Sequence, residues 1–146
     1  MKYVIFDIDG TIADCTHRLK YIQSKPKDYK KFYAECVHDE PIDDMIQLVM
    51  HMYRSGYEIV FCTGRSEVVR KETEEWLRKH LSGIYFELFM RETGSNVPDK
   101  IAKVKQMKDE GYTPDKVYAV FEDRDSVVEA YRVCGYRCLQ VNKGDF

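Results

Sequence analysis

The sequence predicts an α/β protein with three layers, in which helices cover both faces of one doubly wound parallel sheet. Two observations lead to this prediction. Apolar runs of strand length alternate with segments of helical periodicity, which is typical of parallel strands joined by right-handed crossovers. The strand runs are also almost continuously apolar, as expected for strands covered on both faces. With 146 residues, we expect a single domain, 1–146, that buries a real core.

The elements follow from local patterns. Short runs rich in β-branched and aromatic residues predict strands at 2–7, 57–62, 84–90, 116–122 and 137–141. Apolar side chains spaced three or four apart predict helices at 43–56, 66–81, 99–111 and 125–135. In the helix at 99–111 this spacing predicts that Ile101, Val104 and Met107 face the core.

One segment, 14–41, interrupts the alternation directly after the first strand. It is rich in lysine and tyrosine, and we expect two short helices on either side of Pro26. Two interpretations stay open at this point. The segment is either a solvated helical hairpin or a small cap-like insert that forms one wall of a ligand site.

Composition narrows the class of protein. The formal net charge is −2, so no global basic field indicates a nucleic-acid binder, and a polyanion would have to be held locally. The five cysteines form no CxxC pair, which favours a reducing cytoplasm over a disulfide framework. No apolar run approaches the ~20 residues of a membrane span, so we expect no membrane partner.

Chemically active side chains gather where the expected strands end, which is the edge at which open α/β sheets bind ligands. They are Asp7 and Asp9 after the first strand, Thr63, Gly64 and Arg65 after the second, and Glu122 and Asp123 after the fourth. Several acids at one edge repel one another, and a divalent cation such as Mg²⁺ would relieve that repulsion.

These residue types suit phosphoryl transfer. Asp7 can attack phosphorus and form an aspartyl-phosphate, while Asp9 is placed to protonate the leaving oxygen and then deprotonate water. The hydroxyl of Thr63 and the backbone N–H groups around Gly64 can hold phosphoryl oxygens. We expect Mg²⁺ at Asp7, Asp9, Glu122 and Asp123. Adjacent side chains in an extended segment point to opposite faces, so we assign Asp123 to the metal and Glu122 to a metal-held water.

Two motifs carry a family resemblance. "FDIDGT" matches the first motif, DxDx[TV], of the haloacid dehalogenase (HAD) superfamily, and "FCTGR" matches its second motif. Within that superfamily the chain resembles the 3′-phosphatase domain of phage-type polynucleotide kinase/phosphatase. The similarity includes "DGTIADCTHR", "MRETG" and "EDRDSVVEAYRVCG" and spans nearly the whole chain.

The resemblance implies further site residues. Arg18 and Arg65 correspond to arginines needed for phosphatase activity in that family and are expected to bind substrate phosphate. Lys103 corresponds to the lysine that neutralises the phosphoryl group, although Lys100 and Lys105 remain alternatives because lysines are dense there.

The predicted function is a Mg²⁺-dependent phosphatase that removes 3′-phosphate from DNA or RNA ends in the cytoplasm, with a phage-infected host cell as one setting. Two alternatives remain: a phosphatase of small phosphomonoesters such as nucleotides, and a catalytically idle module on the same scaffold. The chain holds no GxxxxGK[ST] sequence, so this chain alone should not phosphorylate 5′ ends. A separate kinase or ligase is a candidate partner. Oligomeric state stays open.

Overall fold

The computed structural model describes residues 1–145 and contains the predicted parallel sheet. Its strands are β1 (Tyr3–Phe6), β4 (Glu58–Ser66), β5 (Phe86–Arg91), β6 (Val117–Glu122) and β7 (Cys138–Gln140). They lie in the order β5-β4-β1-β6-β7, and every neighbouring pair is parallel. After β1 the chain builds one half of the sheet and then the other, so β1 lies at the topological switch point.

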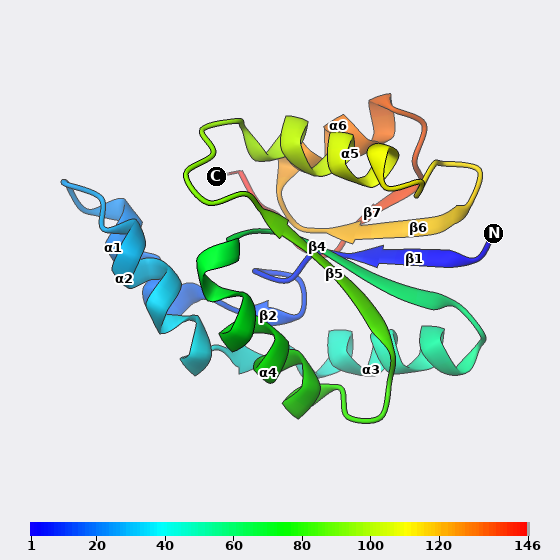
Figure 1. Ribbon diagram of the computed structural model, residues 1–146, viewed down its shortest axis with the longest axis horizontal. Helices are drawn as coiled ribbons and strands as arrows, with labels where there is room; N and C mark the ends of the chain where they lie inside the picture. The colour runs from blue at the N-terminus through cyan, green and yellow to red at the C-terminus, as the bar shows by residue number, and fades with distance from the viewer. Residues whose placement is uncertain (146) are drawn as a thin grey trace.

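Helices cover both faces, which confirms the predicted three-layer α/β fold. They are α3 (Asp43–Arg54) and α4 (Arg70–His80) on one face, with α5 (Asp99–Asp109) and α6 (Asp125–Val133) on the other (Figure 1). Alternate side chains of β1 divide between two cores, with Phe6 packing toward α3 and α4 and Ile5 toward α5 and α6. The sheet thereby fixes the positions of the residues that follow its strands.

Two details depart from the predicted elements. The strand expected to end at residue 62 continues as β4 to Ser66, and the next helix begins with a short 3₁₀ turn, η3 (Glu67–Val69), before α4. In α5 the prediction for Ile101 was wrong, because its side chain is 51% exposed. Lys103 is buried beside Val104 and Met107 instead. The ammonium of Lys103 forms ion pairs with buried acids, so this lysine is in the interior, whereas the apolar periodicity predicted Ile101 there.

The segment after β1 forms no part of the main sheet. Its elements are β2 (Ala13–Asp14), η1 (Thr16–Arg18), α1 (Lys20–Gln23), α2 (Tyr29–Ala34), η2 (Glu35–His38) and β3 (Glu40–Pro41). The antiparallel pair β2–β3 closes its base, and Pro26 separates the two short helices as expected. Figure 1 shows α1 and α2 projecting from the edge of the sheet. We call residues 14–41 the insert. Its function as a cap stays a prediction.

Candidate active site

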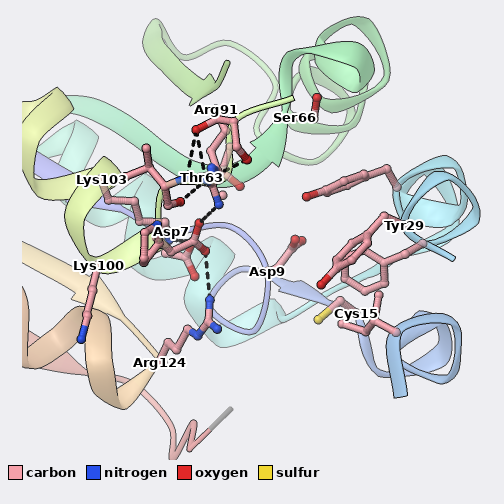
Figure 2. A pocket seen from close by; sticks show the side chains of 18 of the residues that line it. Asp7, Asp9, Cys15, Tyr29, Thr63, Ser66, Arg91, Lys100, Lys103 and Arg124 are labelled. Atoms are coloured by element: carbon pink, nitrogen blue, oxygen red, sulfur yellow. Dashed lines mark hydrogen bonds and ion pairs between the residues drawn. The ribbon is translucent and has the colours of Figure 1, made fainter. Parts of the chain in front are cut away.

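A cavity of about 740 Å³ opens at the carboxyl ends of β1, β4 and β6. Asp7, Asp9, Thr63 and Gly64 line it together with Lys103, Glu122 and Asp123, so residues from several strand ends and from α5 share one site. The insert supplies another part of the wall, and the loop between β5 and α5 a third. Figure 2 shows this cavity from close by. The position at the switch point is the one expected for a ligand site in an open α/β sheet.

Asp7 lies at the end of β1 with both carboxylate oxygens engaged. The ammonium of Lys103 donates to Oδ1 at 2.7 Å, and the hydroxyl of Thr11 donates to Oδ2 at 3.2 Å. Burial, and next the charge of Glu122, raise the pKa of Asp7 well above its ordinary value despite Lys103. Burial alone would lower the pKa of Lys103, but Asp7 and Glu122 raise it, so the ammonium keeps its charge. Of the three lysines considered from the sequence, Lys103 contacts Asp7.

Glu122 and Asp123 complete a group of buried acids. Carboxylate oxygens of Asp7, Glu122 and Asp123 lie within 4.8 Å of one another. Both adjacent acids reach this group, contrary to the expectation that they point to opposite faces, because β6 ends at Glu122 and its alternation stops there. Burial, and then Glu122, raise the pKa of Asp123 to about 7. Three clustered acids and one lysine leave excess negative charge, and oxygen ligands of this kind suit a divalent cation.

The two acids differ in how they are held. Glu122 accepts hydrogen bonds at both oxygens: Oε2 from Lys103 at 2.9 Å, and Oε1 from the backbone N–H groups of Asp123 at 3.1 Å and Arg124 at 3.3 Å. Although burial would raise it, Lys103 lowers the pKa of Glu122. Asp123 packs against Gly10, where an added Cβ would lie 2.1 Å from Oδ2 of Asp123 at a φ of +80°. Glycine at position 10 therefore gives Asp123 its place beside β1.

Asp9 lies outside that group of three, although the sequence assigned it to the metal as well. Two arginines hold it: Arg18 donates to its Oδ1 at 2.7 Å, and Arg65 donates to the same oxygen through Nε at 3.0 Å and Nη2 at 2.7 Å. Burial would raise the pKa of Asp9, but Arg65 and Arg18 lower it below its ordinary value. Among the described residues, the hydrogen bonds to this side chain all fall on Oδ1, and the side chain is 23% exposed toward the cavity.

Neither arginine reaches the cavity in the structure. Arg18 is 0% and Arg65 1% exposed, and neither lines the cavity. Both also donate to one further acid, Asp39, at distances from 2.7 to 2.9 Å. Their contacts support the positioning of Asp9. Direct binding of substrate phosphate by these two arginines stays a prediction without a contact in its favour.

Asp39 is the site residue that sequence reasoning missed. It is buried in the insert just before β3, and its backbone carbonyl accepts a hydrogen bond from the indole of Trp76 at 2.9 Å. His17 approaches the same carboxylate at 2.7 Å. Arg18 and Arg65 both bind Asp39 and Asp9, so the two negative charges balance the two positive charges. No motif marks it, and the local signal is limited to an acidic pair, Asp39 and Glu40, that precedes Pro41 at the end of a lysine-rich segment.

Thr63 and Gly64 lie at the cavity as predicted. Thr63 is 1% exposed, and its hydroxyl accepts a hydrogen bond from the backbone N–H of Arg65 at 3.1 Å. At Gly64, an added Cβ would lie 2.5 Å from Oδ2 of Asp99, so a larger residue would displace that carboxylate. Asp99 in turn pairs with Arg91 at 2.7 Å and Arg124 at 3.0 Å. These contacts fix the loop that closes the far side of the cavity.

The sequence and the structure were both compared with those of known proteins. The model of a family described as the phosphatase domain of polynucleotide kinase PNKP matches residues 1–146, the whole chain. The chain belongs to this family. It is therefore a phosphatase domain of the HAD type, a hydrolase, which confirms the resemblance drawn from "FDIDGT" and "FCTGR".

Individual relatives agree with the family. A protein named "Putative bifunctional polynucleotide kinase/RNA ligase" from Autographa californica nuclear polyhedrosis virus is 31% identical over 132 residues, covering 90% of this chain and 18% of that protein. A chain in the solved structure of a Pnkp1/Rnl/Hen1 complex aligns with a TM-score of 0.81 and 29% identity, over 99% of this chain and 47% of that one. This chain thus spans less than half the length of either relative.

More distant structures support the fold alone. CbbY from Rhodobacter sphaeroides, solved in complex with phosphate, aligns with a TM-score of 0.65 at 13% identity, over 100% of this chain and 87% of that one. In the part of the chain that the structure describes, no helix is both long enough and apolar enough to cross a bilayer.

Proposed function

We propose that this phosphatase removes 3′-phosphate from polynucleotide ends, with Mg²⁺ at the acid group and an aspartyl-phosphate intermediate on Asp7. The observation that carries the proposal is the placement of Asp7: it lies at the cavity with Lys103 2.7 Å from one oxygen and with the acids Glu122 and Asp123 beside it. The family and the names of the relatives, which include kinases and an RNA ligase, support a polynucleotide substrate. They also support a kinase or ligase as partner.

In the first step, a carboxylate oxygen of Asp7 forms a bond to phosphorus as the bond from phosphorus to the 3′ oxygen breaks. Lys103 lies beside the attacking carboxylate, where its charge offsets that of the phosphoryl group. Thr63 and the backbone at Gly64 line the same end of the cavity and are assigned to the phosphoryl oxygens. Since Oδ1 of Asp7 is bound by Lys103, the carboxylate is held in one orientation for attack.

Asp9 is assigned to proton transfer. It gives a proton to the departing 3′ oxygen and later takes one from the water that attacks phosphorus, which releases phosphate and restores Asp7. The arginines bind Oδ1, and the side chain of Asp9 lines the cavity with 23% of its surface exposed. Although Asp9 has a lowered pKa in the free protein, a bound phosphate dianion is a like charge that raises it.

The acid group fits Mg²⁺. Asp7 and Asp123 would hold the ion. Glu122 would support them, because its oxygens accept three hydrogen bonds from Lys103 and the backbone, whereas Oδ2 of Asp7 accepts one from the hydroxyl of Thr11 at 3.2 Å, which a cation can displace. When bound, the ion supplies positive charge that offsets the repulsion between these acids and substrate phosphate. Asp9 as a further metal residue stays a prediction, because its carboxylate lies outside the group formed by the other three acids.

The test is phosphate release from 3′-phosphorylated RNA and DNA oligonucleotides in the presence of Mg²⁺. The matched controls are the same oligonucleotides with 5′-phosphate and a nucleoside 3′-monophosphate. We expect release from the 3′-phosphorylated oligonucleotides and little from the 5′-phosphorylated ones. Equal or faster turnover of the mononucleotide would favour the alternative, a phosphatase of small phosphomonoesters, whose substrates a cavity of about 740 Å³ also accommodates.

A further inference from the structure

The cavity extends well beyond the space that a phosphoryl group needs. Asp7, Thr63 and Lys103 lie at one end, and the insert provides a wall with three aromatic side chains, Tyr29, Phe32 and Tyr33. Figure 2 shows Tyr29 on the side of the cavity across from Asp7 and Lys103. A substrate whose phosphate binds at Asp7 must extend its remaining atoms into this space. The aromatic wall is therefore a surface that the rest of the substrate meets.

The three rings serve different purposes. Phe32 is 9% exposed, and the guanidinium of Arg18 lies 4.5 Å from the centre of its ring, so Phe32 covers the buried arginine. Tyr29 is 49% exposed and has no such part in the core. Its ring lies beside that of Tyr33, with centroids 6.4 Å apart and planes at 30°. The neighbouring ring supports Tyr29 from one side, and the exposed surface of Tyr29 remains available to a ligand.

Positive charge accompanies this exposed ring. The ammonium of Lys27 lies 5.9 Å from the centre of the Tyr29 ring, and the nearby Lys25 and Lys30 are exposed. Proteins bind single-stranded nucleic acids through aromatic side chains next to flexible cations, because the bases stack on the rings while the phosphates bind the cations. A lysine-bearing helix that served only for solubility would not need to place a tyrosine at the cavity.

We propose that Tyr29 is the stacking platform for the base of the nucleoside that carries the 3′-phosphate, with Lys27 contacting the phosphate on its 5′ side. This inference rests on the proposed function and adds a subsite for a nucleobase to it. The subsite takes any base, since each has an aromatic face, and it acts on substrate affinity rather than on the bond-breaking step.

The experiment pairs a variant of the protein with a variant of the substrate. Two 3′-phosphorylated oligonucleotides are compared, one with a normal terminal nucleoside and one whose terminal residue is abasic. Tyr29→Ala should lower kcat/KM at least fivefold on the base-bearing end, which is about 1 kcal/mol, and leave the abasic end unchanged. With the wild-type protein, kcat/KM on the abasic end should already be lower than on the base-bearing end by the same factor. Unchanged turnover of the abasic end also shows that the variant folds.

Two controls sharpen the result. Tyr29→Phe keeps the ring and should match the wild type, and Tyr85→Ala removes a tyrosine that is 67% exposed outside this cavity and should have no effect. Equal losses on both oligonucleotides, or no loss on either, would overturn the stacking role of Tyr29. If the wild type releases phosphate from neither 3′ end, the proposed function fails and the subsite fails with it, which is a different outcome from the first two.

Discussion

The carboxyl-terminal edge of the sheet, where the strands end at the cavity, and the insert differ in how they hold charged side chains. We call the first region the sheet edge. At the sheet edge, charged side chains are buried and paired: Lys103 lies between Asp7 and Glu122. In the insert, the lysines are exposed, and Lys20, Lys27 and Lys31 lie over tyrosine rings. Buried ion pairs fix geometry, which the chemical step needs, whereas exposed cations adapt to a ligand at low cost. Arg18 and Asp39 connect the two regions, since the insert carries them and they reach inward to Asp9 and Arg65.

Substitution of the nucleophile should have the largest effect and gives the first test of this comparison. Asp7→Asn should reduce phosphate release to below ~1% of the wild type, because an amide is a poor nucleophile toward phosphorus. The measurement is single-turnover phosphate release with purified protein. Residual turnover above that level in a folded variant would contradict a covalent mechanism on Asp7.

The second prediction contrasts buried with exposed acids inside the insert. Asp39→Asn removes the shared partner of Arg18 and Arg65, so we expect the free energy of unfolding to fall by about 3–5 kcal/mol, as for other broken buried pairs. Asp28 instead caps α2 by accepting from the N–H of Lys31 at 3.0 Å on the surface. Asp28→Ala should cost only ~1 kcal/mol.

Urea unfolding of the two variants beside the wild type measures both effects. An Asp39→Asn variant as stable as Asp28→Ala would show that the arginines do not depend on Asp39. Buried and exposed acids of the insert would then contribute equally to stability, which contradicts the contrast drawn here.

Much of the sheet edge could be predicted because its signals are local. The run ending at Asp7 and Asp9, and the pair Glu122 and Asp123, follow strands that read clearly from apolar patterns, and parallel strands bring such ends together. Lys103 was assigned through the family resemblance, while its burial contradicted the apolar spacing that favoured Ile101. A salt bridge across 96 positions in the chain leaves no trace in the local pattern.

The insert was harder to predict for the same reason. Its two short helices follow from Pro26 and the local composition, but the contacts of Asp39 span 21 positions to Arg18 and 26 to Arg65. Those arginines were expected at substrate phosphate, whereas burial places them behind Asp9. Pairing between distant charged residues depends on how the insert folds back onto the sheet, and no periodicity encodes that.

The third prediction separates the two adjacent acids at the metal. Asp123→Ala should raise the Mg²⁺ concentration needed for half-maximal activity by ~10–100-fold, whereas Glu122→Asp, which keeps a carboxylate beside Lys103, should be milder. Titration of activity with MgCl₂ measures both. The reverse order, or full activity in EDTA, would place the cation elsewhere.

The smallest effect is expected in the insert, where Lys27→Gln removes one exposed cation. On single strands each phosphate contact contributes ~0.7 to the slope of log affinity against log salt. If Lys27 contacts a phosphate, the slope for kcat/KM on a 3′-phosphorylated oligonucleotide should become shallower by about that amount. Lys116→Gln removes the same charge just before β6, at the end of the sheet opposite the cavity, and should leave the slope unchanged. Equal changes in both variants would mean that net charge alone attracts the substrate. The insert would then lose its distinction from the rest of the surface, and the sheet edge alone would account for recognition.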